Sequence, residues 1–169
     1  MPNNIFAFFR NFKWMTEKKI IPDNGLKYNI LIVDDIELNT KILKLFLNNE
    51  LKDNVKIDCC VNGIEAIKKI FSVKYIYDII FIDNHMPELN GTETVKILRI
   101  LKYDKLIIGI TGDTSTKSII FHYCGIDYMF SKPFDKIKTN LVLNVLFKYG
   151  NKQFNNKRLL MSAGKLSWT

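Results

Sequence analysis

The chain has 169 residues, of which 47% are hydrophobic and 25% charged, and this length and composition are typical of a soluble protein with one folded domain. Most of the net charge of +8 lies at the two ends, where residues 1–27 hold five basic and two acidic side chains and residues 151–169 hold four basic and none acidic. With no recognition motif beside it, this distribution argues against specific nucleic-acid binding. No apolar stretch is long enough to cross a bilayer and no signal peptide is evident, so we expect a cytoplasmic protein. The three cysteines form neither a disulfide framework nor a metal-binding pattern, so we expect buried reduced thiols.

The first 27 residues form a basic, amphipathic extension. Ile5, Phe8, Phe9 and Phe12 recur at the spacing of one helix face, and basic residues occupy the other sides. The pattern predicts a helix and leaves three roles open. The helix packs against its own domain, docks on a partner, or lies on a membrane surface.

Five short apolar runs follow, rich in Ile, Val, Phe and Tyr. Runs of continuous hydrophobicity are typical of strands that are buried on both faces of a parallel sheet. The predicted strands span 28–33, 55–60, 78–82, 106–110 and 126–130.

Segments of helical period alternate with these strands. One apolar stripe contains Leu38, Ile42, Leu45 and Phe46, and a second contains Ile64, Ile67 and Ile70 or Phe71. Further helices are predicted at 92–103, 114–124 and 133–148, with Gly125 as a helix C-cap. The alternation predicts one doubly wound α/β domain over residues 28–150, with helices on both faces of the sheet. Residues 151–169 are expected to be a disordered basic tail.

Polar side chains follow four of the predicted strands. Asp34 and Asp35 come after the first strand, Asp83 after the third, Thr111 after the fourth and Lys132 after the fifth. A single Asp in such a place commonly caps a helix or a turn. Because parallel strands end at one edge of a sheet, we expect all five side chains to converge.

The chemistry of these five side chains is complementary. Three adjacent carboxylates repel one another and need a cation, and an oxygen-only site of this size suits Mg²⁺. Lys132 and the Thr111 hydroxyl suit a phosphoryl group. One carboxylate could then act as a nucleophile and form an acyl phosphate.

The motifs around these residues resemble the receiver domain of the two-component response-regulator family. The resemblance covers residues 28–150 and is carried by LIVDDIELN, VNGIEAI, DNHMPELNG, GITG and SKPF. It implies a flavodoxin-like, five-stranded parallel sheet of order 2-1-3-4-5. It also implies that a histidine kinase or a histidine phosphotransfer protein donates the phosphoryl group.

The resemblance assigns a role to each site residue. Asp83 would be the phosphoacceptor, and the domain would catalyse its own phosphorylation and dephosphorylation. Mg²⁺ would be bound by Asp35 directly, by Asp34 largely through water, and by Asp83 and the main-chain carbonyl of His85. Thr111 would follow the phosphoryl oxygen, Lys132 would pair with it, and the Lys132–Pro133 peptide bond would be cis. The segment ELN after the acidic pair is similar to receivers of hybrid kinases and phosphorelays.

Two features depart from the family pattern. Met129 stands where an aromatic residue is usual, between Tyr128 and Phe130, and the stretch from Thr111 to Gly125 is about one residue short. Both bear on how phosphorylation is passed on to a target and not on its chemistry.

The sequence leaves two other functions open. A pseudo-receiver would be an interaction module that no longer accepts phosphate, and a phosphatase would use an Asp nucleophile. The phosphatase is disfavoured because His85 stands where such an enzyme needs a second acidic residue. Too few residues follow Gly150 for an effector domain, so we expect the domain to act through partner proteins.

The two histidines have different expected roles. The His85 side chain either orients water at the mouth of the site or is an ordinary exposed loop residue. His122, on a predicted helix, is expected to be structural.

Overall fold

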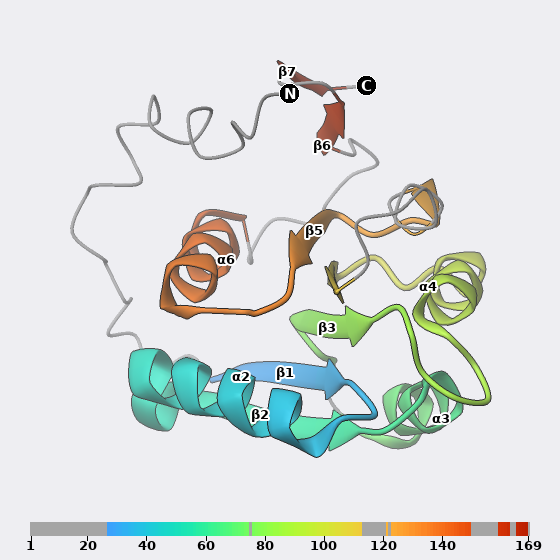
Figure 1. Ribbon diagram of the computed structural model, residues 1–169, viewed down its shortest axis with the longest axis horizontal. Helices are drawn as coiled ribbons and strands as arrows, with labels where there is room; N and C mark the ends of the chain where they lie inside the picture. Colours follow the sequence, from blue (N-terminus) through green and yellow to red (C-terminus); the bar gives the residue numbers. More distant parts are fainter. Residues whose placement is uncertain are drawn as a thin grey trace.

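A five-stranded parallel sheet forms the centre of the molecule (Figure 1). The structure is a computed structural model and describes residues 27–74, 76–112, 121, 123–149, 159–162 and 165–168. The strands lie in the order β2-β1-β3-β4-β5, as the sequence resemblance implied. They are β1 (Tyr28–Val33), β2 (Val55–Cys60), β3 (Ile79–Asp83), β4 (Leu106–Thr111) and β5 (Tyr128–Ser131). The sequence placed the first two exactly as observed and the other three within two residues at either end.

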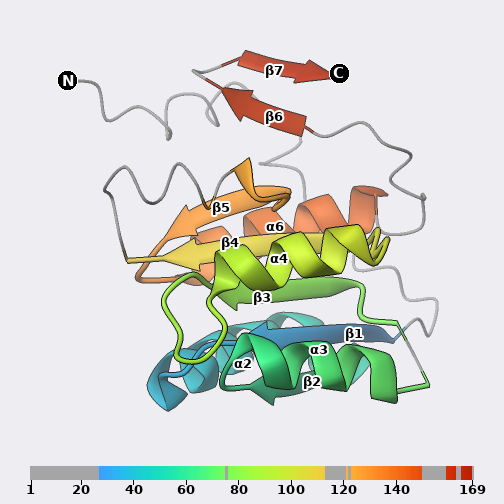
Figure 2. The same cartoon turned by 90° about the vertical axis from the view of Figure 1, so that its right-hand side faces the viewer.

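Helices cover both faces of this sheet. Figure 2 shows α3 and α4 in front of the strands and α2 and α6 behind them. The helices are α2 (Glu37–Leu51), followed by the 3₁₀ turn η2 (Lys52–Asn54), α3 (Gly63–Ser72), α4 (Gly91–Ile100) and α6 (Lys136–Tyr149). Of the predicted helix at 114–124, the structure describes only residues 121, 123 and 124, and His122 lies outside the described residues.

The core is divided by the sheet into two layers, because successive side chains of a strand point to opposite faces. Ile30 and Ile32 of β1 pack with Leu43 and Leu47 of α2 in one layer. Leu31 and Val33 pack in the other layer, with residues of α3 and α4. Burial on both faces explains why the central strands read as unbroken apolar runs.

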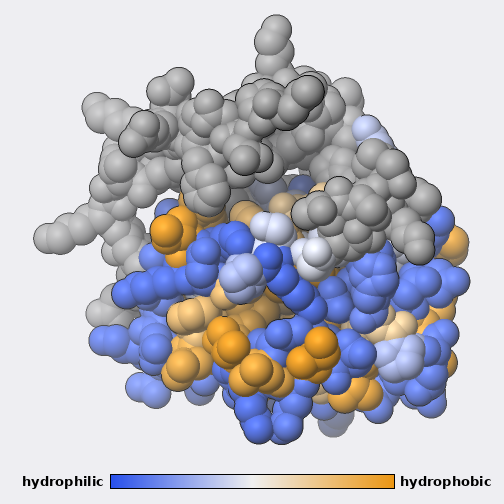
Figure 3. Space-filling view, viewed as in Figure 1, coloured by the Kyte–Doolittle hydropathy of each residue, from blue (hydrophilic) through white to orange (hydrophobic). Residues whose placement is uncertain are grey.

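The apolar stripe predicted for α2 is not the one that faces the sheet. Of the predicted stripe, Leu38, Ile42 and Leu45 are 64%, 39% and 57% exposed and Phe46 is half-buried. The buried side chains are those of Leu43, Leu47 and Leu51. Hydrophobic side chains therefore gather over α2 on the face of the molecule seen in Figure 3. In α3, Ile67 and Ile70 pack against the core as predicted, whereas Ile64 and Phe71 are exposed.

The edge strand β2 corrects the prediction for the cysteines. Cys59 and Cys60 point to opposite faces, as expected, and all three thiols are free, but Cys59 is exposed while Cys60 and Cys124 are buried. A strand at the edge of a sheet is only partly covered, so one face of β2 near its end meets solvent.

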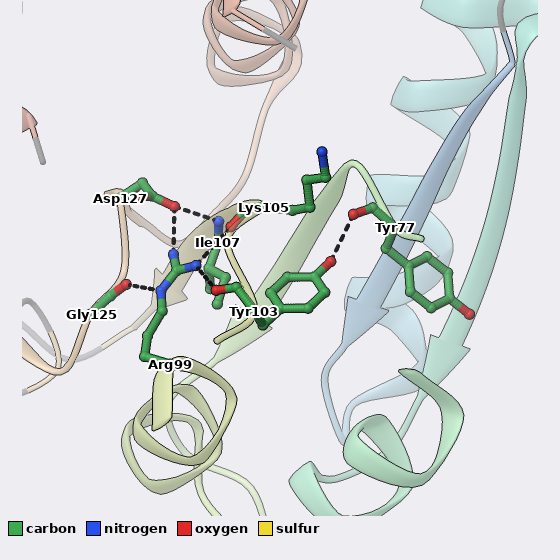
Figure 4. Close-up of polar contacts among 7 residues, drawn as sticks. All are labelled: Tyr77, Arg99, Tyr103, Lys105, Ile107, Gly125 and Asp127. Carbon is green, nitrogen blue, oxygen red and sulfur yellow. Dashed lines mark hydrogen bonds and ion pairs between the residues drawn. The ribbon is translucent and has the colours of Figure 1, made fainter. Parts of the chain in front are cut away.

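A half-buried arginine, Arg99, holds together the chain at the amino ends of β4 and β5 (Figure 4). The guanidinium of Arg99, near the end of α4, donates to three backbone carbonyls and one carboxylate. These acceptors are Tyr103 O at 2.6 Å, Lys105 O at 2.9 Å, Gly125 O at 2.8 Å and Asp127 Oδ2 at 2.8 Å. Gly125 has φ 119°, which agrees with the glycine C-cap expected at this position. The network joins α4 to the starts of β4 and β5.

The chain ends bear on the predicted division into 1–27, 28–150 and 151–169. Residues 1–26, and with them the predicted amphipathic helix, lie outside the described residues. Within 151–169 the structure describes an antiparallel strand pair, β6 (Leu159–Ser162) and β7 (Lys165–Trp168), which the expectation of a disordered tail did not anticipate. Among the helices that the structure describes, none has the length and apolar character needed to cross a bilayer.

Candidate functional site

Three carboxylates meet at the carboxyl ends of β1 and β3. These two strands are paired in parallel, with Val33 opposite Ile82, so Asp34, Asp35 and Asp83 arrive at the same edge of the sheet. A ligand oxygen of each lies within 4.8 Å of the others. Asp34 and Asp83 are buried and Asp35 is exposed. The acidic cluster predicted from the sequence is therefore present.

Lys132 supplies the positive charge of the site. Its ammonium lies 2.9 Å from Asp34 Oδ2 and 3.1 Å from Asp83 Oδ2 and so bridges the two buried carboxylates. The backbone fixes this approach, because Lys132 N donates to Thr111 O at 2.8 Å. The Lys132–Pro133 peptide bond is cis, as the sequence resemblance implied.

Burial and this bridge set the ionisation of the pair. Burial raises the pKa of Asp83, and the ammonium of Lys132 opposes that rise without cancelling it. Burial would lower the pKa of Lys132, but its contacts with Asp34 and Asp83 outweigh burial and raise it. Lys132 is therefore charged at neutral pH.

Thr111 ends β4 beside the acidic cluster. Asp83 is opposite Ile110 in the β3–β4 pair, so Thr111 is one residue further along, and its side chain is buried. At the next residue, Gly112, an added Cβ would meet none of the atoms that the structure describes within 4 Å.

The loop after Asp83 is held in a fixed path. Asn84 O accepts from Gly91 N at 3.1 Å, and Asn84 Oδ1 accepts from Thr92 N and Oγ1. A Cβ at Gly91 would lie 2.2 Å from Asp83 O, so only glycine fits there. His85 projects from this loop with an exposed side chain and lines a surface cleft together with Asp35.

Asn39 is a site residue for which the sequence suggested no role. From the first turns of α2 its Nδ2 donates to Asp34 Oδ1 at 3.0 Å and to Asp34 Oδ2 at 3.1 Å. The backbone N–H of Ile36 donates to Asp34 Oδ1 at 2.9 Å. The spacing of five residues from Asp34 is the signal that could have indicated this contact, because it places Asn39 in the helical turn that follows the strand.

Met129 lies on β5, away from the carboxylates. It is half-buried and packs against the core layer that contains α3 and α4. Its neighbours Tyr128 and Phe130 pack against the opposite layer, and Phe130 makes an edge-on contact with Phe134. The aromatic side chains of β5 therefore face α2 and α6.

Comparison with models of protein families shows which family this chain resembles. The model of the response regulator receiver domain matches residues 30–144. The chain belongs to this family. It is thus a receiver domain of two-component signalling, and receivers of this kind work with histidine kinases or phosphotransfer proteins.

Curated relatives of this receiver are both long and short. It is 36% identical over 129 residues to hybrid signal transduction histidine kinase E of Dictyostelium discoideum. This match covers 72% of the chain and 7% of the kinase. It is 30% identical over 123 residues to the two-component response regulator ARR22 of Arabidopsis thaliana. This match covers 70% of the chain and 83% of ARR22. The chain therefore spans a small part of one relative and most of the other.

Solved structures share the fold. A two-component response regulator from Clostridium difficile superposes with a TM-score of 0.65 at 28% identity, over 74% of this chain and 99% of that chain. The chemotaxis response regulator CheY4 of Vibrio cholerae superposes with a TM-score of 0.61 at 23% identity, over 71% and 98% of the two chains.

Proposed function

We propose that this receiver takes a phosphoryl group from a phosphohistidine onto Asp83, in the presence of Mg²⁺, and signals through protein partners. The observation that carries the proposal is the placement of one lysine ammonium against two buried carboxylates, beside a third carboxylate that is open to solvent. This set supplies a nucleophile, ligands for a metal ion and a cation for the incoming phosphoryl group.

The donor atoms at the site suit Mg²⁺. The cluster offers only oxygen ligands, and three carboxylates within 4.8 Å need positive charge in addition to one lysine. Asp35 and Asp83 would bind the ion directly, Asp34 largely through water, and the main-chain carbonyl of His85 would complete the protein ligands. When bound, the ion would neutralise charge on the phosphoryl oxygens.

The transfer step is a displacement at phosphorus. A carboxylate oxygen of Asp83 forms a bond to phosphorus while the bond from phosphorus to the histidine nitrogen breaks, and the electron pair of that bond returns to the imidazole. Lys132 turns from Asp83 to an oxygen of the transferred group, and the Thr111 hydroxyl donates to another. The product is an acyl phosphate on Asp83, which water later hydrolyses.

Phosphorylation assays test this assignment. The full chain is incubated with a phosphorylated histidine protein or acetyl phosphate, with Mg²⁺ or with a chelator, and intact-protein mass spectrometry follows the added phosphoryl group. We expect one group per chain, only with metal, and none on Asp83→Asn. Asp104→Asn, which changes an exposed aspartate outside the site, is the matched control and should be labelled like the wild type.

Two results would contradict the proposal. One is labelling of Asp83→Asn at the wild-type rate, which would place the acceptor elsewhere. The other is a wild-type chain that remains unlabelled by either donor while it still binds a histidine phosphotransfer protein. That result would support the alternative of a pseudo-receiver, an interaction module that does not depend on phosphorylation.

A further inference from the structure

The carboxylate of Asp34 accepts from three donors, and the proposed phosphoryl transfer gives a role to only one of them, Lys132. Ile36 N reaches only Oδ1, Lys132 Nζ reaches Oδ2, and Asn39 Nδ2 reaches both oxygens. Asp34 is 6% exposed, so water has little access to replace a lost partner.

Lys132 serves two carboxylates that compete for it. Its ammonium is 2.9 Å from Asp34 and 3.1 Å from Asp83, so the contact with Asp34 is at least as close as that with the acceptor. A phosphoryl group on Asp83 adds negative charge on that side and draws the ammonium away from Asp34 Oδ2. Among the described residues, the donor that then remains on this oxygen is Asn39.

We propose that Asn39 is a positioning residue that keeps Asp34 hydrogen-bonded and in place when Lys132 turns to the phosphoryl group. Its uncharged amide remains hydrogen-bonded to Oδ2 after the lysine leaves, and Oδ1 stays bonded to Ile36 N. Asn39 thereby lowers the cost of releasing Lys132. This role rests on the proposed function, because it concerns the state in which Asp83 carries a phosphoryl group.

A stability cycle in chelator tests the contact without metal and without phosphorylation. Melting temperatures are compared for wild type, Asn39→Ala, Lys132→Ala and the double variant. We expect Asn39→Ala to lower the melting temperature at least twice as much in the Lys132→Ala background, where Asp34 Oδ2 loses its last described donor. Asn48→Ala is the control, because Asn48 is exposed on the same helix and the change in helix propensity is the same.

A second measurement tests the role in the phosphorylated state. Titrations determine the affinity for Mg²⁺ alone and then for beryllium fluoride, a phosphoryl mimic, at saturating Mg²⁺. We expect Asn39→Ala to weaken Mg²⁺ binding less than about threefold and beryllium fluoride binding about tenfold or more, a change in beryllium fluoride affinity within the usual range of coupling between sites. Asn48→Ala should leave both affinities unchanged. If Asn39→Ala does not fold, Asn39→Leu, which has a similar size and no donor, replaces it in both experiments.

Additive losses in the stability cycle would overturn the proposal, and so would an Asn39→Ala variant with wild-type affinity for beryllium fluoride. A wild-type protein that binds neither Mg²⁺ nor beryllium fluoride would contradict the proposed function instead. In that case the stability cycle still decides whether Asn39 and Lys132 share Asp34.

Discussion

Asp83 lies where a negative charge is costly. Its side chain is 4% exposed, and burial raises its pKa even though Lys132 is in contact. A carboxylate in this position reduces the stability of the folded state, a trade-off that is common at active sites and that fits the phosphoacceptor role proposed above.

The first prediction is that Asp83→Asn raises the free energy of unfolding by about 1 kcal/mol in chelator at pH 7.5, because it removes a buried negative charge. A gain of this size is usual for a stabilising substitution. The folded pKa of Asp83 lies above its unfolded value, so the ionised form destabilises the native state above the folded pKa. Below both pKa values the carboxyl is neutral in either state and the cost disappears. The gain measured by urea unfolding should therefore shrink as the pH falls toward 4.

Asp104→Asn is the control for this prediction, because Asp104 is exposed and makes no contact with Lys132 among the described residues. A gain that is the same at both pH values, or a loss at pH 7.5, would show that burial of the charge is not its cause.

At the scale of single residues, the sequence predicted the polar groups of the site well and their supporting contacts poorly. The site contains Asp34, Asp35, Asp83, Thr111 and Lys132. Each of them lies at the end of a strand or just after it, and the ends of parallel strands meet in space. Asn39 lies on a helix, and its contact with Asp34 depends on how α2 is rotated. That rotation is not set by residue spacing alone.

The helix α2 has two apolar stripes, and only one of them can face the sheet. Leu43, Leu47 and Leu51 are spaced by four residues, as are Leu38 and Ile42. Both stripes predict an amphipathic helix, so the sequence indicated its existence but not its buried side. Packing against Ile30 and Ile32 decides between them.

The second prediction separates the two stripes. Leu47→Ala should lower the free energy of unfolding by about 3 kcal/mol, because its side chain is fully buried and the change leaves a cavity. Leu45→Ala, two residues away on the exposed stripe, should change stability by less than about 0.5 kcal/mol. Urea unfolding at neutral pH measures both. Equal losses would mean that Leu45 is also covered in solution.

At the scale of the whole molecule, the carboxyl and amino ends of the parallel strands carry different side chains. The carboxyl ends of the strands carry the carboxylates, Thr111 and Lys132, whereas Arg99 and its acceptors fasten the opposite edge (Figure 4). The doubly wound α/β fold could be predicted because the strands alternate with helices, and the strand order was implied by the resemblance to the receiver family. The arginine network could not, since its acceptors are mostly backbone carbonyls whose positions no sequence pattern reveals.

The third prediction concerns Arg99→Lys. A lysine cannot reproduce the planar fork that reaches Gly125, Lys105 and Asp127 together, so several partly buried acceptors would lose their donor. We expect a loss of about 2 kcal/mol in the free energy of unfolding with Mg²⁺ affinity unchanged within about twofold, because the change lies at the far edge of the sheet. Lys96→Arg, the reverse exchange at an exposed position of the same helix, should be neutral. A large loss of Mg²⁺ affinity would show that the two edges are coupled.

The strand order also determines when the site is completed as the chain leaves the ribosome. The three adjacent strands β2, β1 and β3 are contiguous in sequence and carry Asp34, Asp35 and Asp83, so the acidic part of the site can assemble from the first half of the domain. Lys132 is synthesised roughly 3 to 10 seconds later at ordinary translation rates. If the three strands pair during that interval, their clustered carboxylates would lack their lysine, and a divalent cation would be the readiest partner for them.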